Sequence, residues 1–170
     1  MINYAQQLLD LYNAANPSLA HPATLDDVEI YNNPMQGGPS EQFNTTTYIT
    51  AKEESIYFVG STSIYYNRLP TGITSRIIDG DGVDDWQMDG HVVASINGML
   101  DEKYANGEYF VLEDFEIERR AGENGSLIVS VRMNHIKYIP PETETGMWEF
   151  TILPLKVDLS GTQGELNGFK

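Results

Sequence analysis

The sequence contains no cysteine. This absence excludes disulfides, thiol nucleophiles and cysteine-ligated metals, and it leaves the redox compartment open. No apolar run approaches the roughly 20 residues that a membrane-spanning helix requires. The N-terminal stretch MINYAQQLLDLYNAANPSL lacks the basic and continuous apolar regions of a signal peptide. We therefore expect a soluble protein that is made in the cytoplasm and has no membrane partner.

Basic residues are scarce as well. The 170 residues include 10 Lys and Arg against 25 Asp and Glu, which gives a formal net charge of −15. Affinity for DNA or RNA comes mainly from Lys and Arg side chains that neutralise phosphates, so specific nucleic-acid binding is not expected. An acidic surface would suit a conduit through which DNA slides without adhering.

Hydrophobic periodicity predicts a helix followed by strands in the first half of the chain. Apolar residues recur at helical spacing between residues 2 and 15, and Pro17 ends the pattern, with Asn3 and Gln6 as a capping pair. Two β-rich runs follow, NTTTYITAK and SIYFVGSTSIYYNRL. In the second run, a glycine at position 60 suggests a bend or bulge within a strand whose apolar face consists of Ile56, Phe58, Ile64 and Tyr66.

The same order of signals returns in the second half. The stretch LDDVEI at 25–30 matches LEDFEI at 112–117, and each follows a helical pattern and precedes two strand patterns. We predict an α+β fold of two tandem helix-plus-β-hairpin units, a degenerate internal repeat packed together with mostly antiparallel sheet. The predicted boundaries are 1–76 and 91–159 for the units, 77–90 for an acidic Asp/Gly linker and 160–170 for a C-terminal tail. The alternative is one α+β domain in which two similar stretches recur by chance.

The predicted linker, IIDGDGVDDWQMDG, resembles a calcium-binding loop in composition. With Gly82 at position 6 of an EF-hand loop, three aspartates fall at ligand positions. Positions 1 and 12, which need oxygen ligands, are then Ile77 and Met88. A solvated acidic linker explains the stretch better. A weak calcium site is the only cofactor that the sequence suggests, and its candidate ligands are Asp79, Asp81, Asp84 and Asp85.

Paired acids also recur in both halves, as Asp26, Asp27 and Glu29 and as Glu113, Asp114 and Glu116. Acid–base catalysis places two carboxylates in different environments, whereas acids at equivalent turn positions are more simply caps. The three histidines, His21, His91 and His135, have no metal-ligand spacing, and no nucleophile or phosphate-loop motif is present. We expect no enzymatic activity; a small carboxylate-based hydrolase is the alternative.

Four residues are candidates for an interface with other subunits. Tyr65, Tyr66 and Arg68 belong to the stretch YYNRL at a strand end, and Trp148 begins the alternating pattern of a late strand. Tyr, Trp and Arg are enriched at interface hot spots. Tyrosines in a strand are also ordinary core residues, so both interpretations stay open.

The first 70 residues or so resemble small domains in structural proteins of tailed bacteriophages, especially those with contractile tails. In that pattern a helix leads into L-x-x-x-D-[VI], then a Thr-rich strand, then a glycine-containing strand ending in Y-Y-N-R-[LI]. The residues that carry the resemblance are Leu25, Asp27, Val28, Thr45 to Thr50, Gly60, Ser61 and Tyr65 to Leu69. The second half keeps the helix and LEDFEI but lacks YYNR.

The resemblance implies a non-enzymatic assembly role in a virion. We expect a neck or tail ring subunit, such as a terminator or collar protein, whose partners are copies of itself and other virion proteins. It would be synthesised in the host cytoplasm and located in the virion. One alternative is a capsid decoration protein; another is a soluble, calcium-responsive binding module that uses the aspartates at 79–89.

Overall fold

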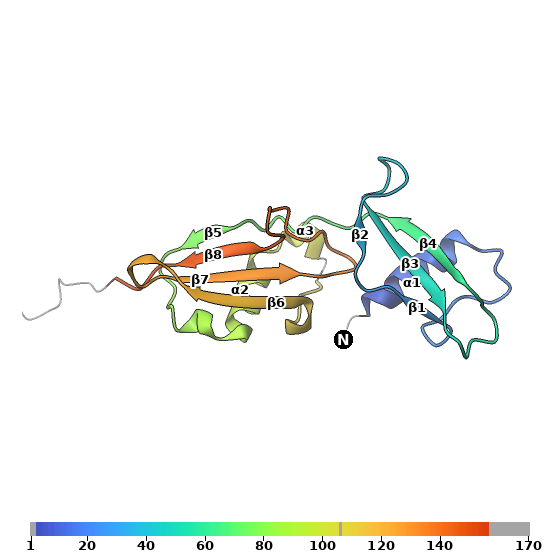
Figure 1. The fold of residues 1–170 in the computed structure, drawn as a ribbon, viewed down its shortest axis with the longest axis horizontal. Helices are drawn as coiled ribbons and strands as arrows, with labels where there is room; N and C mark the ends of the chain where they lie inside the picture. Colours follow the sequence, from blue (N-terminus) through green and yellow to red (C-terminus); the bar gives the residue numbers. More distant parts are fainter. Residues whose placement is uncertain (1–2, 106, 157–170) are drawn as a thin grey trace, which may run out of the picture.

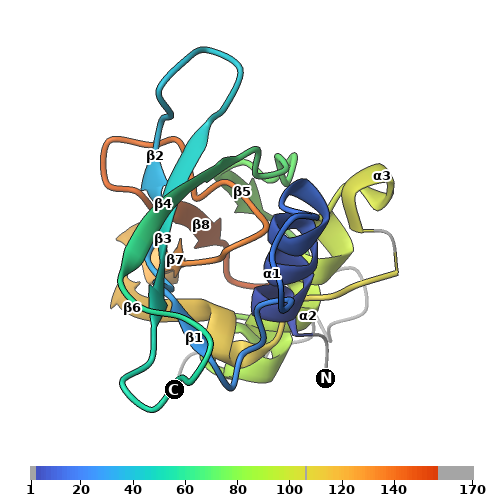
Figure 2. The same ribbon diagram turned by 90° about the vertical axis from the view of Figure 1, so that its right-hand side faces the viewer.

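Two separate β-sheets, each with a helix against one face, make up the fold (Figure 1). The computed structural model describes residues 3–105 and 107–156. The first unit contains α1 (Tyr4–Ala15), β1 (Val28–Ile30), β2 (Met35–Gln36), β3 (Thr45–Ala51) and β4 (Ser61–Tyr66). Strand β3 lies in the centre of its sheet and pairs antiparallel with each of the other three. The side view in Figure 2 places α1 beside one face of this sheet.

Helix α1 forms where the sequence predicts it. The Asn3 side chain accepts a hydrogen bond from the backbone N–H of Gln6 at 3.1 Å, which confirms the predicted capping pair. The helix ends at Ala15, two residues before Pro17. Its buried face supplies Leu9 to a small core that also contains Val28 of β1 and Ile49 of β3. Burial of these side chains holds the helix against the sheet.

The second unit has a larger core. It contains β5 (Arg76–Ile78), the 3-10 turn η1 (Asp85–Gln87), α2 (Asp89–Met99), α3 (Glu102–Ala105), the turn η2 (Leu112–Asp114), β6 (Phe115–Ala121), the turn η3 (Glu123–Gly125), β7 (Leu127–Met133) and β8 (Trp148–Ile152). The strand order is β5-β8-β7-β6, with only the β5–β8 pair parallel. The predicted α+β class with mostly antiparallel sheet is therefore confirmed. No helix within the described ranges is long and apolar enough to cross a bilayer.

Both units follow the same path: helix, turn, then three strands that pair in sequence, β1-β3-β4 and β6-β7-β8. The matching turns are built alike. Asp27 Oδ2 accepts from Thr24 Oγ1 at 2.6 Å, and Asp114 Oδ2 accepts from the N–H of Val111 at 2.8 Å. The carbonyl of Asp27 accepts from the N–H of Lys52 at 2.9 Å. The predicted turn-capping role is confirmed for Asp114, whose carboxylate accepts a backbone N–H, whereas the Asp27 carboxylate accepts a side-chain hydroxyl.

Three details of the sequence prediction are wrong. Residues 52–60 form the connection between β3 and β4, so that Ile56 is 83% exposed rather than on the apolar face of a continuous strand. The left-handed φ of +83° at Gly60 makes the turn into β4. Leu25 packs against the first core, but its counterpart Leu112 is 44% exposed. The two units thus share the turn and the strand pairing, but not the apolar contact of the leucine.

The third detail is the acidic linker. Residues 77–90 belong to the second unit, because β5 pairs with β8 and the Trp86 side chain is fully buried in the second core. The crossing between the two sheets lies instead at residues 67–75, which carry no strand of either sheet. The predicted tail at 160–170, and residues 157–159 of the second predicted unit, lie outside the described residues.

Candidate functional site

The two units are joined by backbone hydrogen bonds at the crossing. The N–H of Leu69 donates to the carbonyl of Lys137 at 2.8 Å, and the N–H of Ile139 donates to the carbonyl of Leu69 at 2.9 Å. Tyr66 at the end of β4 adds a third link, since its hydroxyl donates to the carbonyl of Ile136 at 2.8 Å. These bonds fix the segment that leaves the first sheet against the segment that leaves β7.

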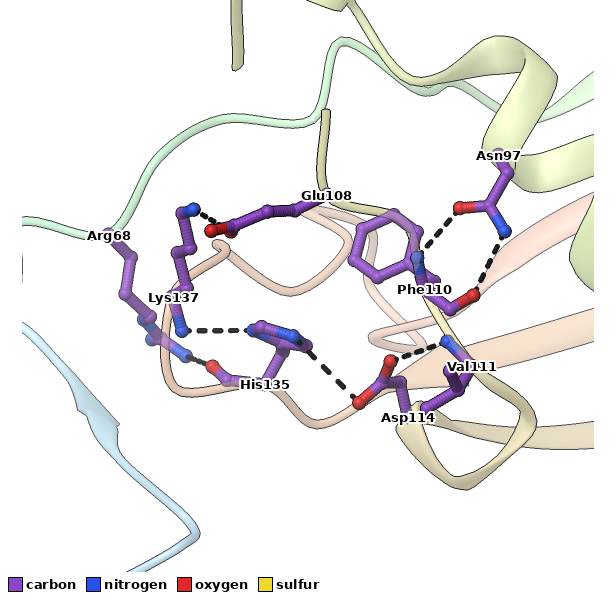
Figure 3. Close-up of polar contacts among 8 residues, drawn as sticks. All are labelled: Arg68, Asn97, Glu108, Phe110, Val111, Asp114, His135 and Lys137. Carbon is purple, nitrogen blue, oxygen red and sulfur yellow. Dashed lines mark hydrogen bonds and ion pairs between the residues drawn. The ribbon is translucent and has the colours of Figure 1, made fainter. Parts of the chain in front are cut away.

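A buried arginine reinforces this junction (Figure 3). The Arg68 side chain is 4% exposed; its Nε donates to Thr45 Oγ1 at 2.9 Å, and an Nη donates to the carbonyl of His135 at 3.5 Å. Desolvation lowers the pKa of Arg68. Both acceptors are neutral, and they belong to different units. Arg68 therefore links the two units structurally.

His135, whose carbonyl accepts from Arg68, is itself buried, with 3% of its surface exposed. Its Nδ1 accepts the N–H of Lys137 at 2.9 Å, so the neutral ring carries its proton on Nε2, 3.8 Å from an Asp114 oxygen (Figure 3). Burial, aided by the nearby charges of Lys137 and Arg68, lowers the pKa of His135 to about 4. Because one ring nitrogen is occupied and the other is buried, the imidazole is held as a packing group rather than as an accessible general base.

An ion pair completes the junction. Lys137 Nζ contacts a Glu108 carboxylate oxygen, and the other oxygen of that carboxylate accepts from the Gln7 amide of α1 at 3.0 Å. The Tyr4 ring of α1 packs edge-on against His135, with ring centroids 4.3 Å apart. Helix α1 is therefore tied both to its own sheet and to the second unit.

Two of the four aspartates of the candidate calcium site, Asp79 and Asp81, have side-chain partners within the protein. Asp79 lies 3.4 Å from Lys156 Nζ, and Asp81 accepts from the indole N–H of Trp86 at 3.1 Å. Asp84 precedes the turn η1, and Asp85 begins it. Among the residues that the structure describes, no three His, Asp or Glu side chains lie close enough together to hold a metal ion.

The outward faces of the two sheets differ in chemistry. The face of the first sheet that points away from α1 carries Tyr31, Met35, Tyr48 and Tyr65, each at least 38% exposed. Threonine and serine side chains fill the spaces between them along β3 and β4. The corresponding face of the second sheet carries the ion pairs Arg120–Glu149 and Arg132–Glu116. A solvated sheet normally resembles the second face, so the first is the candidate interaction surface.

The four predicted interface residues lie in three different parts of the structure. Tyr65 lies on this surface. Tyr66 and Arg68 act inside the chain, at the junction. Trp148 is 3% exposed in the second core, so its assignment to an external interface is wrong; its bulk and alternation reflect the inner face of β8. Sequence reasoning missed Glu108, His135 and Lys137, because their contacts join segments that no local pattern connects.

No curated protein matches the chain, and no solved structure matches it. One family model matches residues 1–100, which covers the first unit and continues through α2. Since this match spans more than half of the 170 residues, the chain belongs to the family of unknown function DUF7941.

Proposed function

We propose that this chain is a non-enzymatic structural subunit of a tailed-phage particle, in a neck or tail ring, which acts through contacts with copies of itself and with other virion proteins. The observation that carries the proposal is the outward face of the first sheet, which is mostly uncharged and whose one charged strand residue is Glu29 of β1, paired with Thr50. On a chain with a net charge of −15, a surface of exposed tyrosine, methionine and threonine is where another protein can approach with little like-charge repulsion.

Three further points support this proposal. The resemblance to phage structural domains covers the unit that carries the surface. The junction residues, including Arg68 and His135, are packed and hydrogen-bonded inside the chain, as suits a rigid building block. The acidic surface also suits a subunit close to packaged DNA, because it gives phosphates little to bind.

Particle composition tests the proposal. Particles of the phage that encodes the chain are purified on a density gradient, and the chain is quantified by mass spectrometry with isotope-labelled peptides. We expect it in the particle fraction at a fixed ratio to the major capsid protein. A chain found only among the soluble proteins of the lysate would overturn the proposal.

A substitution tests whether the outward face of the first sheet is required for entry into particles. Tyr48→Glu places a charge in the middle of this face, where the wild-type side chain is 38% exposed. We expect the variant to fold, as judged by circular dichroism, and to enter particles less than the wild type. Glu118→Lys, which changes a charge on the exposed face of the second sheet, is the matched control and should enter particles normally. Equal incorporation of all three proteins would reject this face as the assembly surface.

A further inference from the structure

Strand β4 forms an edge of the first sheet and pairs only with β3 among the described strands (Figure 1). The register shows which of its backbone groups point outward. The N–H of Ala51 donates to the carbonyl of Gly60 at 2.8 Å, and bonded and non-bonded pairs alternate along an antiparallel ladder. The even-numbered residues of β4 therefore bond to β3. The N–H and C=O groups of Ser61, Ser63 and Tyr65 point away from the sheet.

This outer edge of β4 is unprotected. Within residues 3–105 and 107–156 its outward groups have no backbone partner, and the one side-chain contact is that of the Thr62 hydroxyl with the carbonyl of Ser63, at 3.5 Å. Such an edge is a template for another strand, and proteins usually protect it with charged side chains. The edge strand of similar length in the second sheet, β6, has the sequence FEIERRA, with four charged residues. The sequence of β4, STSIYY, has none.

A groove between α1 and β4 lies along the same edge. Its volume is about 320 Å³, and none of its lining residues is charged. Leu11 of α1 lines it and is 65% exposed, and Ile64 and Tyr66 line it from β4. Because side chains alternate along a strand, a new strand beside β4 would place every second side chain toward this groove. The open edge and the groove together form one strand-binding site.

The edge of β4 is complementary to its own copy. Its outward residues are evenly spaced, so two copies of β4 can run antiparallel with Ser63 opposite the same residue of the other copy. Ser61 of each copy then lies opposite Tyr65 of the other, and all the outward N–H and C=O groups find partners. A contact of this kind is isologous, since both copies use the same patch. Although each chain carries a net charge of −15, neither β4 nor the groove lining brings a charged residue into this contact.

We infer that two copies of this chain pair through β4 in a two-fold antiparallel contact centred on Ser63, so that the four strands of each first sheet join into one sheet. This inference rests on the proposed function, because it names one of the contacts between copies that this function requires. Opposite residues of an antiparallel pair point to the same face. The outward faces of the two copies therefore lie side by side and form one larger surface for another virion protein.

Cysteine cross-linking tests the register, because the chain has no native cysteine. Opposite residues of a bonded pair have Cα atoms about 5.5 Å apart, which a disulfide can bridge. On oxidation, Ser63→Cys alone should therefore give a linked dimer. Two copies of Ser61→Cys, or two of Tyr65→Cys, would have their cysteines about 13 Å apart along the strands. Each should give roughly tenfold less dimer alone, and a mixture of the two should give the linked product.

The cross-linking controls share the same strand. Equal dimer yields from Ser63→Cys and from Ser61→Cys alone would indicate unspecific collision and would overturn the inferred contact. Absence of a dimer from both Ser63→Cys and the mixture of Ser61→Cys with Tyr65→Cys would overturn it as well. Circular dichroism of each variant establishes that the chain is folded.

A backbone substitution tests the contact without a cross-link. Ser63→Pro removes the N–H that points outward, so the ladder with β3 keeps its hydrogen bonds while both copies lose a donor at the centre of the contact. Sedimentation equilibrium should show the dissociation constant of the dimer raised roughly tenfold or more. Ser63→Ala keeps the N–H and should dimerise like the wild type. Equal dimerisation of all three proteins would reject β4 as the contact.

Particle analysis separates failure of this inference from failure of the proposed function. If the chain is present in particles but Ser63→Cys does not cross-link there, the β4 contact between copies is wrong and the virion role stands. If Ser63→Pro also fails to enter particles in that case, β4 pairs with a strand of a different virion protein. If the chain is absent from particles, the proposed function is wrong, and the cross-linking alone decides whether copies pair through β4.

Discussion

At the junction, burial lowers the pKa of His135 from its ordinary value of 6.5 to about 4. The folded chain therefore binds fewer protons than the unfolded chain between these two pH values. The contribution of His135 to the free energy of unfolding is therefore fully present above pH 6.5 and is lost as the pH falls toward 4. This contribution is at most about 3 kcal/mol. Two neighbouring carboxyl groups also have shifted values: burial raises the pKa of Asp114, whereas the pKa of Glu108 is lowered because, against the opposing effect of burial, its hydrogen bonds with Lys137 and Gln7 favour the ionised form.

His135→Asn isolates the histidine contribution. An asparagine oxygen can still accept the N–H of Lys137, but the side chain does not titrate. We expect the free energy of unfolding, measured with urea, to fall less steeply between about pH 6.5 and pH 4 in this variant than in the wild type. His21→Asn changes an exposed histidine and should leave the wild-type slope unchanged. If the free energy of unfolding falls equally steeply with pH in the wild type and in His135→Asn, the junction histidine does not determine the loss of stability in acid.

At the scale of elements, the two matching turns allow a paired experiment. Asp27→Ala and Asp114→Ala each remove a carboxylate that accepts a hydrogen bond in the turn before the first strand of a unit. We expect each to lower the free energy of unfolding by about 1 kcal/mol, as for other capping residues. The exposed neighbours Asp26→Ala and Glu113→Ala should change it by less than about 0.5 kcal/mol. A loss in one unit alone would mean that the turns are alike in geometry but not in energy.

The acidic segment gives a second prediction at this scale. Because Asp79 and Asp81 already contact Lys156 and Trp86, we expect no saturable heat in a calorimetric titration with millimolar calcium. Asp81→Ala and Asp85→Ala serve as controls for nonspecific heat. Saturable binding that both variants abolish would restore the calcium-responsive module as the leading function.

The elements themselves were largely predictable, and the errors have physical causes. Local signals such as Asn3, Pro17 and the repeated L-[DE]-D-[VF]-E-I act through nearby backbone groups, so they can be read from one stretch of sequence. The prediction of an acidic linker was wrong because its aspartates suggested solvent, while Trp86 enters the core and Ile78 and Val83 pack against it. Ile56 was misplaced because periodicity alone does not distinguish a strand from a turn that happens to alternate.

At the scale of the whole molecule, the sequence could not show how the units meet. The junction joins residues as far apart as Arg68 and His135, or Gln7 and Glu108, and none of these pairs belongs to a local motif. The candidate surface was only partly predictable: Tyr65 was identified, whereas the exposure of Tyr31, Met35 and Tyr48 on the same face depends on tertiary placement.

The net charge leads to a prediction about association. Each copy carries a formal charge of −15, so long-range repulsion opposes contact between copies far more than one or two ion pairs favour it. Salt above about 0.1 M reduces the screening length to below about 10 Å. We expect self-association, measured by sedimentation equilibrium, to strengthen between about 50 mM and about 300 mM sodium chloride. Weaker association at the higher salt would mean that ion pairs dominate the contact.

The parallel pairing of β5 with β8 has a consequence for synthesis. The first sheet is complete once residue 66 has left the ribosome, because all its strands lie within residues 28–66. Strand β5 follows within about ten residues, but its partner β8 is not made until residues 148–152. Domains generally fold as units during translation, so the first unit can fold early. Strand β5 and the edge of β7 that pairs with β8 have no partner until β8 has been made. Nascent chains that stop before residue 148 would carry a folded first half and an open second sheet, which is a natural substrate for chaperones.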